Sequence, residues 1–149
     1  MFVAGDVQSY SNKNDLFNLG TKFKDAHIDI RAAGNCLVLG QGTASVMHLA
    51  RAMEPTLHHL AKRTGVNIGP RDSWGKILNA MDGKIKKMSD ATTKQQARKD
   101  KWSEAYVRLG HVKNAWRDRP MHAKQDFTPS QARDVMNAVR VFMTDLASL

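Results

Sequence analysis

Apolar residues recur at intervals of three and four along most of the chain, which is the spacing of one face of an α-helix. No segment shows the apolar–polar alternation that is typical of a strand. The pattern predicts five helices, over about residues 21–39, 43–64, 73–88, 94–116 and 128 to the C-terminus. We therefore expect an all-α helical bundle, with one domain over residues 15–149. Residues 1–14 lack periodicity and predict a flexible N-terminal arm.

Capping and breaking residues place several of the helix ends. Thr43 is a suitable N-cap for the second helix, and Gly65 is a suitable C-cap for it. Pro55 falls inside that helix and is expected to kink or divide it. Thr128 as N-cap and Pro129 at the first helical position give the last helix a defined start.

Length and composition limit the class of protein. The chain has 149 residues, 42% hydrophobic and 25% charged, as in one soluble globular domain. No apolar run approaches the ~18 to 20 residues of a membrane-spanning helix, so we expect no membrane association. Cys36 is the only cysteine, which excludes an intramolecular disulfide and a thiol-rich metal site. The first residues do not resemble a secretory signal, and we expect a cytoplasmic protein.

The net charge of +9 is concentrated in one part of the chain. Residues 76–119 carry twelve basic and five acidic side chains, whereas residues 120–149 carry three of each. A concentrated positive charge favours a polyanion such as RNA, DNA or an acidic protein. The alternative interpretation is a solvated basic face that only keeps the protein soluble.

Most enzyme motifs are absent from the sequence. There is no glycine-rich phosphate loop, no dinucleotide fingerprint and no His-Glu-x-x-His, so we expect no cofactor and no metal. Arg117 and His122 are separated by four residues where the fourth helix must end. A histidine can move the protons of RNA cleavage, an arginine can hold the phosphate, and Asp118 can orient either group. The alternatives are an exposed loop histidine and an arginine that stabilises a helix C-terminus.

This Arg-polar-x-x-x-His pattern at the end of a long helix resembles the HEPN superfamily (higher eukaryotes and prokaryotes nucleotide-binding domain). Residues 32–54, 112–118, 121–122 and 127–129 are similar to corresponding parts of uncharacterised bacterial HEPN-like proteins. The resemblance covers about residues 15–149. It implies a helical homodimer that brings two Arg/His pairs together, with Arg117, Asp118 and His122 as catalytic residues.

The resemblance also implies an activity and possible partners. Many relatives are metal-independent endoribonucleases that leave 2′,3′-cyclic phosphate ends, and they recur as toxins paired with antitoxins and in phage defence. An antitoxin or other regulatory protein is therefore an expected partner. Some toxin relatives carry a modifiable tyrosine two residues after the histidine, where this chain has Lys124. Other HEPN domains are non-catalytic and serve as dimerisation or nucleotide-binding modules.

Two further groups of residues are candidates for the site. His48, Arg51 and Glu54 follow one another at a spacing of three on the second helix and are expected to form a second polar shell. The alternative for them is a salt-linked surface stripe. The residues expected to bind nucleic acid are Lys84, Lys86, Lys87, Lys113 and Arg119.

Two functional hypotheses follow from the sequence. The first is a dimeric ribonuclease that acts on RNA through Arg117 and His122. The second is a non-catalytic helical module that binds nucleic acid or dimerises, in which Arg117 only caps a helix. A DNA-reading helix-turn-helix is a distant third, because a positive segment alone does not make a recognition helix.

Overall fold

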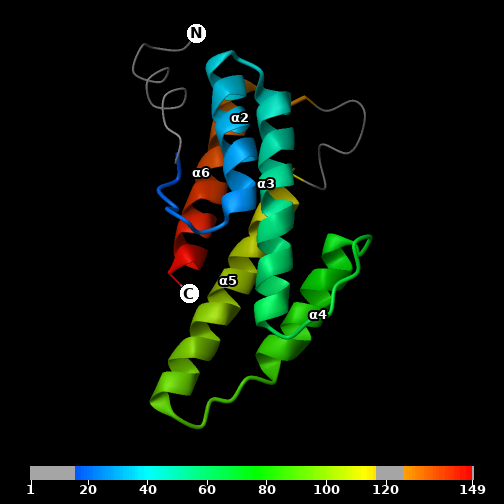
Figure 1. Cartoon of the computed structure of the whole chain (residues 1–149), viewed down its shortest axis with the longest axis vertical. Helices are drawn as coiled ribbons and strands as arrows, with labels where there is room; N and C mark the ends of the chain where they lie inside the picture. The colour runs from blue at the N-terminus through cyan, green and yellow to red at the C-terminus, as the bar shows by residue number, and fades with distance from the viewer. Residues whose placement is uncertain (1–15, 117–125, 149) are drawn as a thin grey trace.

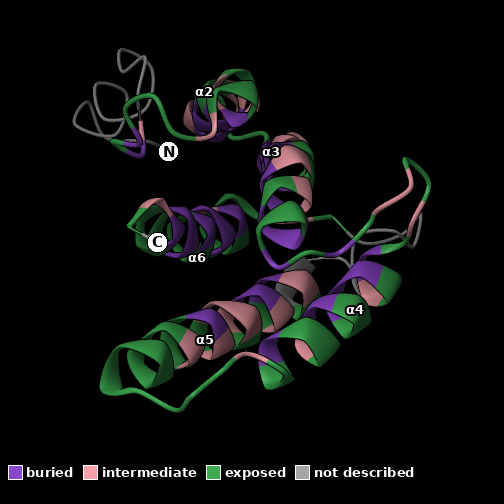
Figure 2. Ribbon diagram, turned by 60° about the horizontal axis from the view of Figure 1, so that its bottom comes forward, coloured by how far each residue is buried: buried purple, intermediate pink, exposed green. Residues whose placement is uncertain are grey.

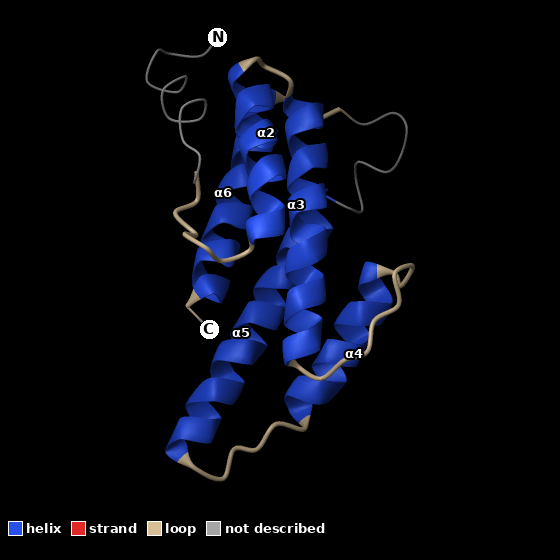
Figure 3. Ribbon diagram, in the orientation of Figure 1, coloured by secondary structure: helices blue, strands red, loops and turns tan. Residues whose placement is uncertain are grey.

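The fold was obtained as a computed structural model, which describes residues 16–116 and 126–148. Within these residues every regular element is a helix, and no strand occurs (Figure 3). The elements are a 3₁₀ turn η1 and five α-helices: η1 (Lys24–Ala26), α2 (His27–Val38), α3 (Gly42–Arg63), α4 (Trp74–Lys86), α5 (Thr93–Trp116) and α6 (Pro129–Ala147). The prediction of an all-α bundle of about five helices is confirmed. The predicted N-terminal arm lies outside the described residues.

Three helices, α2, α3 and α6, pack against one another, and α5 packs against α6 and α4 (Figure 1). Figure 2 shows α4 and α5 lying side by side along one side of α3 and α6. One apolar core runs through all five helices and is formed by the predicted stripes. Its largest fully buried side chains are Trp102, Phe142, Leu37, Leu49, Met53, Leu57, Leu60, Ile77, Met81, Leu109 and Met136. No helix in the described part of the chain is long and apolar enough to cross a membrane.

Three helix ends agree with the predicted ranges and have local caps. Gly65 has a φ of 84°, and the N–H groups of Gly65 and Val66 bond back to Lys62 and Ala61, which closes α3 in a Schellman motif. Ser73 caps α4 by accepting from the Lys76 N–H at 3.2 Å. Thr128 caps α6 in a capping box with Gln131, and Pro129 follows it.

The start of the first helix differs from the prediction. α2 begins at His27, six residues later than the pattern indicates, because Phe23 has a φ of 52° and breaks the helical path. The rings of Phe23 and of His59 on α3 form a T-shaped contact, with 5.7 Å between the ring centroids. The residue that breaks the helical path is thus the one that contacts a distant helix.

The predicted N-cap of α3 was wrong, and so was a division of this helix at Pro55, while a kink there stays a prediction. Gln41 occupies the N-cap position, and Thr43 lies inside the helix. The Thr43 hydroxyl accepts a hydrogen bond from the Phe127 N–H at 2.9 Å instead of capping α3. Pro55 does not divide the helix, since α3 runs without interruption from Gly42 to Arg63.

Candidate functional site

The predicted catalytic residues follow directly after α5. Arg117, Asp118 and His122, together with Arg119, lie outside the described residues, so their roles stay predictions. The described chain ends at Trp116, the last residue of α5, and resumes at Asp126.

The chain that follows the motif is tied to the start of α3. The Phe127 N–H bonds to Thr43, as described above, and Gly42 lies against the backbone of Phe127 and Thr128. A Cβ atom at Gly42 would lie 2.8 Å from the Thr128 carbonyl oxygen and would meet the Phe127 carbonyl oxygen even more closely. The absence of a side chain at Gly42 therefore allows α3 and α6 to meet at this junction.

His48 and Arg51 share one carboxylate, that of Asp29 on α2. The Asp29 Oδ1 atom lies 2.9 Å from His48 Nδ1 and 3.6 Å from Arg51 Nε. The Asp29 side chain is 14% exposed, whereas that of Arg51 is 73% exposed. The cluster links α2 to α3 across one side of the bundle. Sequence reasoning missed Asp29, since its partners on α3 lie 19 or more residues away and leave no local signal.

Glu54 belongs to a different cluster. Its Oε1 atom accepts a hydrogen bond from Trp74 Nε1 at 2.5 Å, which joins α3 to α4. Its Oε2 atom lies 3.9 Å from His58 Nε2. Steps of three residues rotate around a helix by about 60°, so His48 and Glu54 point to neighbouring helices on different sides. The structure therefore brings His48 and Arg51 together but not Glu54; that any of them surrounds the motif stays a prediction.

We expect Asp29→Ala to lower the free energy of unfolding by about 1 kcal/mol, because a partly buried, charge-assisted bond to His48 is lost. Arg51→Ala is the matched control and is expected to change it by less than ~0.5 kcal/mol, since that side chain is mostly exposed. Urea unfolding followed by circular dichroism measures both. Equal losses for the two variants would contradict the central position assigned to Asp29.

The three lysines predicted to bind nucleic acid lie at the C-terminal end of α4, where Lys84 and Lys87 share a face and Lys86 does not, and their role stays a prediction. Lys84 and Lys86 are two residues apart and therefore point about 200° apart around the helix. Lys86 is bonded to Asp82 at 2.7 Å, and this carboxylate raises the pKa of Lys86. Lys113 lies near the other end of the basic segment, in the last turn of α5, and is half-buried.

A different set of cations shares one face of α5 near its N-terminus. Lys94, Arg98 and Lys101 are exposed and follow one another at spacings of four and three. At 1.5 Å per residue, Lys94 lies about 33 Å along α5 from Trp116. These residues were not singled out from the sequence, although they belong to the segment that was identified as basic. Exposed positive charge thus also lies at the end of α5 away from Trp116.

The described residues contain no group of three or more His, Cys, Asp or Glu side chains placed to hold a metal ion. No protein-family model, curated protein or solved structure matches the chain. The resemblance to the HEPN superfamily therefore depends on the quoted sequence stretches alone.

Proposed function

We propose that this protein is a metal-independent endoribonuclease in which Arg117 and His122 are the catalytic residues. The observation that carries the proposal is the spacing of these two residues immediately after the 24-residue helix α5. The excess of basic side chains on α4 and α5 supports a polyanionic substrate. We further propose that two copies of the chain associate to complete the site, and that a regulatory protein controls it.

The proposed reaction needs two proton transfers and stabilisation of negative charge. The 2′-oxygen of a ribose attacks the adjacent phosphorus, and the bond from phosphorus to the 5′-oxygen breaks. His122 either takes the proton from the 2′-hydroxyl or gives one to the departing 5′-oxygen, and water or the second copy's histidine performs the other transfer. Arg117 holds the phosphate oxygens as their charge grows, and Asp118 orients one of the two groups. The products are a 2′,3′-cyclic phosphate and a 5′-hydroxyl.

His122→Ala is expected to lower the rate of RNA cleavage by at least ~100-fold, the usual contribution of a general acid or base. The measurement is cleavage of a mixed RNA pool in EDTA, after size-exclusion chromatography has shown that the variant keeps the fold and oligomeric state. His111→Ala is the matched control, because His111 is exposed on α5 outside the motif.

Three outcomes would contradict the proposal. One is equal cleavage by wild type and His122→Ala, which would indicate a contaminating nuclease. The second is loss of wild-type activity in EDTA. The third is cleavage of a substrate that is 2′-deoxy at the scissile position, since the attacking oxygen would then be missing.

A second candidate function is binding of nucleic acid without turnover. The position of Lys94, Arg98 and Lys101 favours it. These exposed cations lie in the N-terminal part of α5, whereas the motif follows its C-terminal end, and Lys94 is about 33 Å along α5 from Trp116. In that case the wild type binds RNA in a salt-sensitive manner, cuts none, and binds equally well as His122→Ala.

A further inference from the structure

The N-terminal part of α5 extends beyond the helices that cover the rest of it (Figure 1). The guanidinium group of Arg63, the last residue of α3, lies over the Trp102 ring, 5.2 Å from its centroid. The last turn of α6 lies opposite Lys101–Arg108, where the two helices border an open hollow of about 170 Å³. Both neighbours thus end near Trp102. We call residues Thr93–Lys101 the α5 overhang; they extend for about 13 Å.

The face of the overhang that continues the core stripe is basic. Ala105, Leu109 and Val112 face the core at spacings of four and three. The same spacing, continued toward the N-terminus, reaches Lys101, Arg98 and Lys94 in turn. These three side chains are exposed, and Lys101 borders the hollow beside the last turn of α6.

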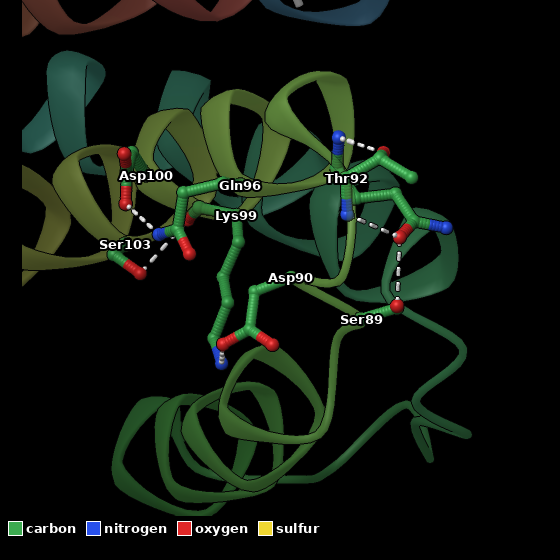
Figure 4. Close-up of polar contacts among 8 residues, drawn as sticks. Ser89, Asp90, Thr92, Gln96, Lys99, Asp100 and Ser103 are labelled. Atoms are coloured by element: carbon green, nitrogen blue, oxygen red, sulfur yellow. Dashed lines mark hydrogen bonds and ion pairs between the residues drawn. The ribbon is translucent and has the colours of Figure 1, made fainter.

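Polar contacts hold the overhang in place without an apolar layer (Figure 4). Thr92 Oγ1 accepts the Gln95 N–H at 3.2 Å, while Gln95 Oε1 accepts from the Thr92 N–H and from the Ser89 hydroxyl. Lys99 donates to Asp90 at 3.2 Å, which ties the helix to the connection from α4. The overhang is therefore a capped and anchored helix end.

The three cations of the stripe have no carboxylate partner among the described residues. The acidic groups nearby are bonded elsewhere: Asp90 to Lys99, Asp100 to Gln96, and Glu104 and Asp145 to Arg108. The first turn of α5 contains no acidic residue, and Lys94 lies at the positive end of the helix dipole. This arrangement is unfavourable unless an anion approaches it.

We propose that the α5 overhang binds the phosphate backbone of a nucleic acid through Lys94, Arg98 and Lys101. Along the helix axis these residues are about 6 and 4.5 Å apart, a spacing at which long side chains reach successive phosphates of one strand. The inference deepens the proposed function, since it gives the RNA substrate a docking surface away from the motif.

The composition of the overhang favours a nucleic acid over an acidic protein. Protein interfaces depend on buried aromatic or large apolar side chains, and the overhang has none. The large apolar side chains that are exposed in the described structure lie elsewhere: Ile28, Leu39, Met47, Val107 and Val141. The overhang also lacks aromatic rings on which bases stack, so its contacts are with phosphates and independent of base sequence.

The test compares two triple variants with the same change of charge. Lys94→Gln, Arg98→Gln and Lys101→Gln remove the overhang stripe. Lys84→Gln, Lys86→Gln and Lys87→Gln, together called the α4 variant, remove three cations from the C-terminal end of α4 and its C-cap. Dissociation constants are measured by fluorescence anisotropy against salt, with single-stranded 2′-O-methyl RNA, duplex RNA and DNA of mixed sequence. The 2′-O-methyl groups prevent cleavage, so binding is measured whether or not the protein is an enzyme. Circular dichroism confirms that each variant is folded.

The overhang variant is expected to bind about 100-fold more weakly at ~0.1 M salt, and the slope of log K against log salt should fall by about 2 to 3. The α4 variant should lose less than about a third of that slope, since Lys86 is paired with Asp82 and all three cations lie at the negative end of the α4 dipole. Equal losses in both variants would overturn the proposal, because net charge alone would then explain binding. So would unchanged binding in the overhang variant, or binding of an acidic protein with none of nucleic acid. Wild-type binding without cleavage would overturn the ribonuclease and leave the overhang proposal intact.

Discussion

Gly42→Ala is expected to destabilise the protein by about 2 to 4 kcal/mol, although alanine is the better helix former by about 1 kcal/mol. The added Cβ would lie 2.8 Å from the Thr128 carbonyl oxygen and in collision with that of Phe127. Both are backbone atoms at the start of α6, so relief requires α3 and α6 to move apart. Urea unfolding followed by far-ultraviolet circular dichroism measures the change.

Gly83→Ala is the matched control for this prediction. Gly83 lies inside α4, and a Cβ there would meet no atom within 4 Å. The substitution is expected to stabilise the protein by about 0.5 to 1 kcal/mol through helix propensity alone. A stabilising effect at both glycines would show that α3 and α6 are not in close contact at Gly42.

Trp102→Ala is expected to lower the free energy of unfolding by about 3 to 5 kcal/mol, as for other buried tryptophans. The indole is 2% exposed and lies in the core at the level where α3 ends, with the Arg63 guanidinium over its ring. The variant loses both the apolar contacts and the cation–π contact. The same urea titration, with the denaturant slope reported, measures the change.

Val107→Ala, on the same helix, is the control for Trp102→Ala. The Val107 side chain is 52% exposed, and its truncation is expected to change the free energy of unfolding by less than ~0.5 kcal/mol. A loss below ~1 kcal/mol for Trp102→Ala would contradict its place in the core.

The sequence predicted the features that depend on near neighbours. Ser73, Gly65 and Thr128 bond to backbone groups within a few residues, so their roles can be inferred from local pattern. The buried stripes were predictable for the same reason, since one helical period determines which residues share a face.

Features that depend on distant residues were missed. Phe23 ends the helical path early beside His59, which is 36 positions away in the chain, and Thr43 bonds to Phe127 across 84 positions. The local pattern predicted that Thr43 is a cap, because Phe127, which bonds to the Thr43 hydroxyl instead, is far away in the sequence.

The candidate surfaces show a similar division. The sequence identified the basic segment, and the role of Lys84, Lys86 and Lys87 in binding nucleic acid stays a prediction. The stripe at Lys94, Arg98 and Lys101 depends on where α3 and α6 end, which no local signal in α5 reveals. Arg117 and His122 stay predictions, since they lie outside the described residues.

The junction at Gly42 and Thr43 has a consequence for how the chain can vary. It ties the start of α6 to the start of α3, so the chain between Thr43 and Phe127, which contains α3, α4 and α5, is an excursion that begins and ends at this junction. The entropy of closing such a loop grows only slowly with length, by about 0.6 kcal/mol for each doubling. Whole helical turns can therefore be added to or removed from the tip of the excursion, beyond Trp102, at little thermodynamic cost. The overhang is the part of the chain whose length evolution can most readily change while the junction is kept.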